Sequence, residues 1–382
     1  MASTAQAKAD QAYDQVVGWM EHFEPLEDPR QSGKVDYALS EILLLVLIAV
    51  LGGAEGWVEV AAFGRKKLAF LRRFAPFTNG TPSHDQLGTV FAALDAEQFQ
   101  SCFIAWTGSL TKLGPDIVAI DGKTMRRAYQ ERGAKPVHMI SAWAAGQRLV
   151  LGQRKVDAKS NEITAIPELL DLLTLKGSIV TIDAMGCQKE IAAKIVAKEA
   201  DYVLALKGNQ GTLRGDVELL CTEQKACGFK DVTASMTRTI EKGHGRIETR
   251  VYTAIGDPGW LQNRHGWAGL RAVVMVESTR EFVDGKSESE TRFYITSLWP
   301  DAGVLAEAVR GHWGVESHHW VMDMVFRDDE CRIRKKNAPA NLATIKHMAS
   351  NLLRKAGGKD SLRVKRKMAG WDDDYLARLI TG

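Results

Sequence analysis

Short apolar runs alternate with segments of helical character between residues 116 and 206, and this alternation limits the fold more than any other feature of the chain. The runs have the length and the Val, Ile and Leu content of buried β-strands, and strands that alternate with helices are typical of an α/β sheet. No Gly-x-Gly-x-x-Gly or Gly-x-x-x-x-Gly-Lys-Ser/Thr sequence follows a run, so dinucleotide-binding and P-loop classes lack support. The predicted strands are 117–120, 139–145, 149–156, 179–182 and 202–206, and the predicted helices are 164–175 and 188–199.

Segments of different character flank this pattern. The first 110 or so residues read as helical, and the unbroken apolar run 42–51, behind Ser40 as a candidate N-cap, is too short for a membrane span of about 20 residues. The segment from Met1 to Asp14 is polar, so no signal peptide is visible. Residues 211–300 predict a β-rich insertion, because β-like runs are punctuated there by Gly and Asp-Pro-Gly turns. Helices are predicted again at 302–310, 315–326 and 341–355.

The chain is therefore expected to have four parts. We predict a helical N-terminal accessory domain at 1–112, for which DNA binding and packing are both open roles, and an α/β domain made of 113–210 and 301–355. The β-rich insertion occupies 211–300, and a basic C-terminal tail occupies 356–382.

Charge is distributed unevenly along the chain. Between residues 331 and 370 there are twelve Lys or Arg and one acid, a net charge of +11 in a chain whose formal net charge is +3. A basic segment of this kind favours a polyanionic partner such as nucleic acid, with a solvated surface as the alternative. The five cysteines are scattered and form no Cys-x-x-Cys pair, which argues against disulfides and structural zinc. We therefore expect a cytoplasmic protein, associated with the nucleoid.

Three carboxylates are the candidate chemical groups. Asp121 and Asp183 each follow a predicted strand, and side chains at the carboxyl ends of neighbouring strands converge. Two carboxylates that close repel each other, and Mg²⁺, which takes oxygen ligands, would remove the conflict. Glu316 shares a helix face with His319, Trp320 and Asp323 through i, i+3, i+4 and i+7 spacing. The alternatives are turn or cap roles for the two Asp residues and a solvated helix side for Glu316.

With these residues the chain resembles the DDE transposases, and more closely the ISAs-type, or H-repeat-associated, family of insertion-sequence transposases. The Asp, Asp and Glu are separated by a β insertion, as in that group, and the matching blocks cover most of the chain. These blocks are Tyr37-Ala-Leu-Ser-Glu41-Ile-Leu, Pro82-Ser-His84-Asp85, Ala119-Ile-Asp121-Gly-Lys123, Asp183-Ala-Met-Gly-Cys187-Gln, Asp201-Tyr-Val-Leu-Ala-Leu-Lys207-Gly-Asn209-Gln210, His244-Gly-Arg246-Ile-Glu248-Thr-Arg250, His312-Trp313-Gly-Val-Glu316 and Phe326-Arg-Asp-Asp329-Glu-Cys-Arg332-Ile-Arg334.

The resemblance implies a fold, an activity and a cofactor. The fold would be a ribonuclease-H-like mixed sheet, and Asp121, Asp183 and Glu316 would be the catalytic and metal-binding triad. The activity would be metal-dependent cleavage and strand transfer at the ends of an insertion sequence, with two Mg²⁺ ions about 3.5–4 Å apart and Mn²⁺ able to substitute. The partners would be double-stranded DNA at the terminal inverted repeats of the element, target DNA, and a second copy of the chain as a homodimer on DNA.

One signature of the broader transposase group is absent. That group often shows Tyr-x2-Arg-x3-Glu-x6-Lys around the glutamate, and the corresponding positions here hold Val309, His312 and Asp323. The phosphate contacts on this helix therefore have to come from other side chains, and Arg310 and Arg327 are candidates.

Further polar and basic residues near these blocks are candidate DNA contacts, with ordinary surface charge as the alternative for each one. The cluster Arg363, Lys365, Arg366 and Lys367 also fits tracking along a DNA backbone. The candidate DNA-binding residues are Lys123, Arg126, Arg127, Lys207, Asn209, Gln210, His244, Arg246, Arg310, His312, Trp313, His319, Arg327, Arg332 and Arg334.

The sequence also bears on functions other than that of a transposase. A non-catalytic DNA-binding protein from a domesticated element is disfavoured by the intact Asp, Asp and Glu, and a DNA nuclease without joining activity stays open. Two Glu-x-x-His sequences, at Glu241 and Glu316, suggest a di-iron bundle, but the Gly residues around His244 and the apolar strands contradict one.

Overall fold

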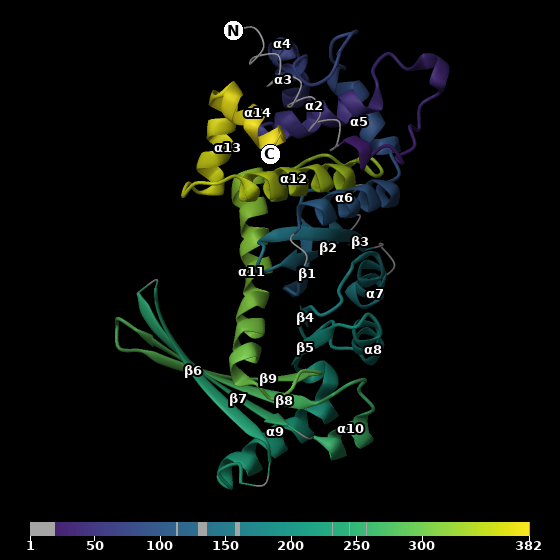
Figure 1. The fold of residues 1–382 in the computed structure, drawn as a ribbon. Coiled ribbons are helices and arrows are strands. Elements are labelled where there is room, and N and C mark those ends of the chain that lie inside the picture. Colours follow the sequence, from purple (N-terminus) through teal and green to yellow (C-terminus); the bar gives the residue numbers. More distant parts are fainter. Residues whose placement is uncertain are drawn as a thin grey trace.

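A computed structural model describes residues 20–111, 114–128, 136–156, 161–230, 232–243, 245–256 and 258–381. In these residues, nine strands form one mixed sheet with the order β3-β2-β1-β4-β5-β9-β8-β7-β6 (Figure 1). The predicted α/β class with a mixed sheet is therefore confirmed. The strands are β1 (Ile117–Met125), β2 (Val137–Ala144), β3 (Leu149–Val156), β4 (Ile179–Ile182), β5 (Asp201–Leu206), β6 (Ala234–Gly243), β7 (Arg246–Gly256), β8 (Ala272–Phe282) and β9 (Ser287–Thr296).

The β-rich segment between residues 211 and 300 extends the sheet rather than forming a separate one. Strands β1, β4 and β5 run parallel, and β9 pairs antiparallel with β5 from Val203↔Thr296 to Leu206↔Phe293. Strand β6 was not predicted, because most of its residues are exposed on both faces and its sequence has no apolar run. The far ends of the β6–β7 and β8–β9 hairpins project beyond the rest of the sheet (Figure 1).

Helices cover both faces of the sheet. Helix α11 crosses one face and contacts strands from β1 and β2 to β6 and β7, whereas α7 and α8 pack on the other face (Figure 1). The helices are α2 (Leu39–Leu51), α3 (Trp57–Lys66), α4 (Leu68–Leu71), α5 (His84–Ala93), α6 (Ala96–Leu110), α7 (Glu162–Leu172), α8 (Lys189–Ala197), α9 (Gly211–Ala226), α10 (Gly259–His265), α11 (Ala302–Phe326), α12 (Ala338–Lys355), α13 (Leu362–Trp371) and α14 (Asp373–Thr381), with 3-10 turns η1 (Ser32–Lys34), η2 (Gly208–Gln210) and η3 (Asp328–Glu330).

Helix α11 is unbroken, so the prediction of two separate helices, 302–310 and 315–326, is wrong. Glycine normally disfavours a helix interior, yet Gly311 and Gly314 both lie inside this one. A Cβ on Gly311 would lie 3.1 Å from Ile117 Cγ2, and a Cβ on Gly314 would lie 2.8 Å from the Trp143 indole nitrogen. The two glycines therefore let the helix backbone approach β1 and β2 closely, and tertiary packing outweighs their helix propensity.

The N-terminal and C-terminal helices share one hydrophobic core. Apolar residues of α2 pack with those of α12, α13 and α14 and with the end of α11. Arg366 on α13 is buried and donates to the carbonyl oxygens of Val50 and Ala54, each at 3.0 Å, and to that of Val325 at the end of α11. The shared core joins the N-terminal helices to the C-terminal ones. The division that sets 1–112 apart as a domain of its own stays a prediction.

The segment expected to be a basic tail contains two packed helices. Lys365 is buried and donates to the Leu353 and Ala356 carbonyl oxygens at 3.3 and 2.6 Å. Lys365 and Arg366 are thus inside the molecule, and the prediction that they track a DNA backbone is wrong. Their positive charges satisfy helix C-terminal carbonyl groups instead. The Ser40 N-cap is also wrong, since α2 begins after Ala38. In the described ranges, no helix is both long enough and apolar enough to cross a bilayer.

Candidate active site

The two predicted aspartates lie side by side at the edge where parallel pairing ends. Strands β1 and β4 pair up to Ile120↔Ile182, and Asp121 and Asp183 are the next residues on each chain segment. Strand β1 does not end there as predicted, because its antiparallel pairing with β2 continues to Met125↔Val137. Asp121 is therefore held inside a strand, whereas Asp183 begins a loop.

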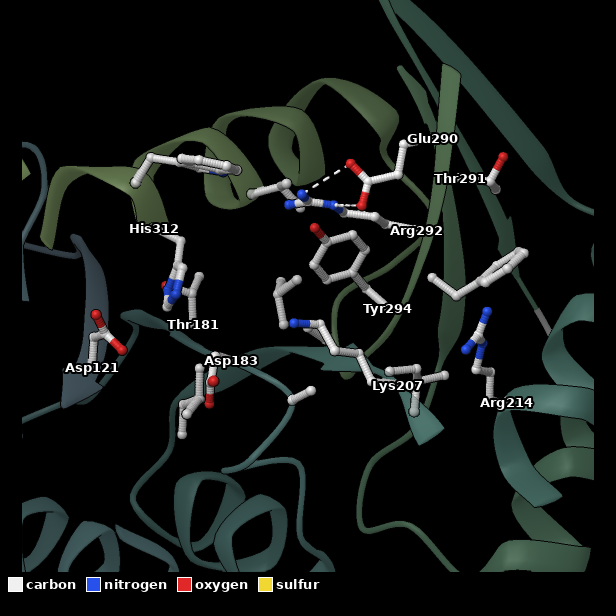
Figure 2. Close-up of a pocket in the computed structure, with 18 of the residues that line it drawn as sticks. Asp121, Thr181, Asp183, Lys207, Arg214, Glu290, Thr291, Arg292, Tyr294 and His312 are labelled. Carbon is white, nitrogen blue, oxygen red and sulfur yellow. Dashed lines mark hydrogen bonds and ion pairs between the residues drawn. The ribbon is translucent and has the colours of Figure 1, made fainter. Parts of the chain in front are cut away.

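Asp121, Asp183 and Glu316 line one cavity of about 320 Å³. Glu316 comes from α11, which crosses the sheet above β1 and β4. Figure 2 shows Asp121, Asp183 and His312 grouped at one end of this cavity, with Arg292, Lys207 and Arg214 further along it. The cavity thus has an acidic end and a side where the three cations outnumber one carboxylate, Glu290, and we call this the basic side.

The loop after β4 is fixed by hydrogen bonds. Asp183 Oδ1 accepts from the backbone N–H groups of Met185 and Gly186 at 3.0 and 3.3 Å, which orients the carboxylate. The side-chain amides of Asn209 and Gln210 donate to the carbonyl oxygens of Ala184 and Cys187, the latter at 2.9 Å. Asn209 and Gln210, predicted as DNA contacts, therefore support the loop that carries Asp183.

Two histidines of α11 lie against the aspartate edge. His319 Nδ1 lies 3.4 Å from Asp121 Oδ2, and His312 Nδ1 lies 3.0 Å from Thr181 Oγ1. Burial by itself raises the pKa of Asp121, but the His319 hydrogen bond and the nearby His319 and His312 outweigh it, so the pKa is lowered. Burial lowers the pKa of His312, and the charges of Asp121, Asp183 and Glu316 oppose that shift. The electrostatic influence of all three carboxylates therefore reaches the His312 ring.

The basic side of the cavity comes from strands and helices that are distant in sequence. Arg292 on β9 forms two hydrogen bonds to Glu290, at 2.8 and 3.0 Å, and its guanidinium lies 5.4 Å from the centre of the Trp313 ring. Lys207 and Arg214 also line the cavity. Arg214 and Arg292 were missed by the sequence reasoning, because no motif marks them and only the β5–β9 pairing brings Arg292 here.

Other predicted DNA contacts lie outside the cavity, most of them in ion pairs. Lys123 pairs with Asp323 and lies 3.3 Å from Asp328. Arg310 lies 2.8 Å from Glu241, and Arg246 lies 3.7 Å from Glu248.

The remaining predicted residues are spread around the end of α11. Arg126 pairs with Asp329 at 3.2 Å, and Arg334 donates to the Arg127 carbonyl oxygen at 3.0 Å. Arg327 ends α11 in a left-handed conformation and pairs with Glu330 and, at 3.3 Å, with Glu55. Arg332 is exposed. His244 lies outside the described residues.

The donor set of the cavity suits a hard divalent cation in its chemistry. Three carboxylates face one cavity, and carboxylate oxygens are the ligands that Mg²⁺ takes in proteins. Across the part of the chain that the structure describes, however, no three His, Cys, Asp or Glu side chains are arranged so that they could hold an ion together.

Comparison with known proteins places the chain among transposases. The family model described as "Transposase DDE domain" matches residues 112–352, and the model described as "DDE_Tnp_1-associated" matches residues 20–107. Two Escherichia coli K12 relatives are named "H repeat-associated putative transposase", YhhI and YbfD. YhhI is 41% identical over 95% of this chain and 97% of its own length, and YbfD is 42% identical over 63% and 95%. An uncharacterized protein in the dhlA 3′ region of Xanthobacter autotrophicus is 44% identical over 73% of this chain and 94% of its own length.

Proposed function

The chain belongs to the family of transposases with a DDE domain, and on that premise we propose that it catalyses metal-dependent cleavage and strand transfer at the ends of an insertion sequence. The observation that carries the proposal is the shared cavity of Asp121, Asp183 and Glu316. By the resemblance of their flanking motifs, these residues would be the Asp, Asp and Glu of the family. The strand order β3-β2-β1-β4-β5, with β1, β4 and β5 parallel, supports a ribonuclease-H-like catalytic domain.

The three carboxylates would hold two Mg²⁺ ions, or Mn²⁺ in their place. When bound, such ions supply Lewis-acid activation of the attacking oxygen and stabilisation of the leaving oxygen. The protein's own residues prepare this end of the cavity. His319 holds the Asp121 carboxylate, and the turn at Met185 and Gly186 holds that of Asp183. In this role His319 is a positioning residue.

The basic side of the cavity suits the DNA backbone. Lys207, Arg214 and Arg292 lie along the cavity from the acidic end, so a strand whose reactive phosphodiester reaches the carboxylates would have neighbouring phosphates beside cations (Figure 2). The DNA would be the terminal inverted repeats of the element and then a target duplex. Because two ends are joined, a homodimer on the DNA and action at the nucleoid belong to the same proposal. So does the division into an accessory N-terminal domain, a catalytic domain and a β-rich insertion.

Asp183→Asn tests the proposal. Asparagine keeps the Oδ1 acceptor for Met185 and Gly186, so the loop should survive while the negative charge is lost. Glu190→Gln on α8 is the matched control, since Glu190 is an exposed carboxylate outside the cavity. We expect Asp183→Asn to abolish strand cleavage of element-end DNA in Mg²⁺, with gel-shift binding of the same DNA retained, and Glu190→Gln to cleave normally.

The outcome separates the alternatives. Cleavage by Asp183→Asn at the control rate would refute the catalytic assignment. A wild-type protein that binds end DNA and does not cut it in Mg²⁺ or Mn²⁺ would be a non-catalytic DNA-binding protein. Cleavage without joining of a 3′-hydroxyl end to a target plasmid would make the protein a nuclease.

A further inference from the structure

A second cavity, of about 550 Å³, lies beside α11, and none of the three carboxylates lines it. It is bounded by the β2–β3 turn, the second half of α11, the end of α12 and the start of α13. We call it the tryptophan–arginine cavity after the side chains that dominate it. Its aromatic and basic lining residues are Trp143, His318, Trp320, Arg148, Arg354 and Arg363.

Among the residues that the structure describes, no carboxylate balances the cations of this cavity. No Asp or Glu lines it, and in the described residues Arg148, Arg354 and Arg363 form no ion pair. Arg354 lies 4.6 Å from the centre of the Trp143 ring, and its Nε is buried without a hydrogen-bond partner. Burial, and then the charge of Arg148, lower the pKa of Arg354 to about 10. An anionic group in the cavity would stabilise the charged forms of Arg148 and Arg354. The lining therefore favours a negatively charged ligand.

The cavity also has an aromatic surface and a buried histidine nitrogen without a hydrogen-bond partner. Trp320 is 63% exposed, so most of its ring surface is available to a ligand in this cavity. His318 is fully buried and stacks on Trp143 with ring centres 4.9 Å apart. Its Nε2 meets His347 Nδ1 at 3.1 Å, while its Nδ1 has no hydrogen-bond partner. The ligand should therefore have a flat apolar face and polar groups as well as negative charge.

Helix α11 lines both the tryptophan–arginine cavity and the cavity of the three carboxylates. Trp320 follows Glu316 by four residues on α11, and residues four apart on a helix are neighbours on its surface. A chain-like ligand that crosses Glu316 would thus meet Trp320 one turn further on. A DNA strand has this form, with phosphates for the arginines and base faces for the tryptophan.

We propose that the tryptophan–arginine cavity binds unpaired nucleotides of a DNA strand next to the phosphodiester at the carboxylates, with a base stacked on Trp320 and phosphates held by Arg148, Arg354 and Arg363. The proposal rests on the proposed function for the position of the strand. It favours DNA over an acidic peptide because Trp320 presents a wide aromatic face, and base–aromatic stacking with arginine support is the usual means of binding single strands. Duplex DNA is a poor fit, since its base faces are already stacked.

The test compares Trp320→Ala with Trp260→Ala. Trp260 is also an exposed tryptophan, and it lies on α10, at the far end of the molecule (Figure 1). Binding of a fluorescent single-stranded oligothymidylate is measured by anisotropy, alongside a duplex of the same length. We expect Trp320→Ala to weaken single-strand binding by about ten-fold, with duplex binding unchanged. Trp260→Ala should leave both unchanged.

A second variant guards against misfolding. Arg148 lies in the β2–β3 turn with φ 58°, a conformation that asparagine also tolerates, so Arg148→Asn should fold. It should weaken single-strand binding and make that binding less dependent on salt, because one phosphate contact is lost. Equal single-strand affinity of Trp320→Ala, Arg148→Asn and Trp260→Ala would overturn the proposal. So would displacement of the oligonucleotide by polyglutamate at the same charge concentration.

These results are independent of catalysis. Asp183→Asn should keep the single-strand affinity of the wild type, because Asp183 does not line the tryptophan–arginine cavity. Normal cleavage by Asp183→Asn together with weaker single-strand binding by Trp320→Ala would refute the catalytic assignment alone. Loss of cleavage by Asp183→Asn together with unchanged single-strand binding by Trp320→Ala would refute only the proposed binding role of the tryptophan–arginine cavity.

Discussion

Close packing of α11 on the sheet can be tested at Gly314, where the helix backbone meets Trp143. An alanine inside a helix is ordinarily more stable than a glycine by about 1 kcal/mol. Here the new Cβ would lie 2.8 Å from the indole nitrogen, a distance that requires something to move. Trp143 has little freedom, because it is 3% exposed, His318 stacks on it, and Arg354 lies against it.

The magnitude follows from these two opposing terms. Overpacking a well-packed core costs about 1–3 kcal/mol, and the helix-propensity gain offsets about 1 kcal/mol of that. We therefore expect Gly314→Ala to lower the free energy of unfolding by about 0–2 kcal/mol. Cleavage should also fall, because a helix pushed away from β2 carries Glu316, two residues along, away from Asp121 and Asp183.

Gly215→Ala on α9 is the matched control. A Cβ at Gly215 meets nothing within 4 Å, so only the helix-propensity gain of about 1 kcal/mol should appear. Urea denaturation followed by circular dichroism measures both variants. Combining Gly314→Ala with Trp143→Phe should recover part of the loss, since the smaller ring removes the clashing nitrogen. If Gly314→Ala stabilised the protein as much as Gly215→Ala does, the close-packing account of α11 would be refuted.

Two further predictions concern the buried polar groups behind the site. Lys346 and Asp328 pair at 2.8 Å with side chains 1% and 5% exposed, and Lys123 lies 3.3 Å from the same carboxylate. Because Lys123 still compensates Asp328, Lys346→Met should cost about 3 kcal/mol in urea denaturation, the low end for a broken buried pair, and a loss below about 1 kcal/mol would contradict a buried pair. Burial lowers the pKa of His347 from 6.5 to about 3, so the folded chain binds fewer protons than the unfolded chain. Its contribution to stability is complete above pH 6.5 and is lost as the pH falls toward 3, at about 1.4 kcal/mol per pH unit. His347→Gln should make the decline between pH 6.5 and pH 4 shallower, and an unchanged slope would show that His347 does not titrate this way.

Local sequence patterns predicted strands well where burial is uniform. Strand β4 has the predicted bounds, 179–182, because all its residues are apolar or small enough for a buried strand. The same patterns failed where packing overrides propensity, as at Gly311 and Gly314 in α11. They also failed at β6, whose exposed residues carry no apolar signal.

The basic stretch shows a second limit of sequence reasoning. Charge alone cannot tell a lysine or arginine that faces solvent from one that satisfies buried carbonyl groups. Lys365 and Arg366 belong to the second kind, because α13 packs against the ends of α2, α11 and α12. The positive charge of the segment therefore overstates what is exposed to a polyanion.

By itself, the sequence determined the fold class, the family resemblance and the order of the three carboxylates, because apolar runs and the residues that end them are local features. Tertiary structure alone decided that α11 is one helix, that Arg292 and Arg214 face the carboxylates' cavity, and that Trp320 and three arginines share a second cavity. Those arrangements depend on contacts between residues far apart in the chain. The free energy of such contacts comes from shape and charge complementarity, which no short stretch of sequence contains.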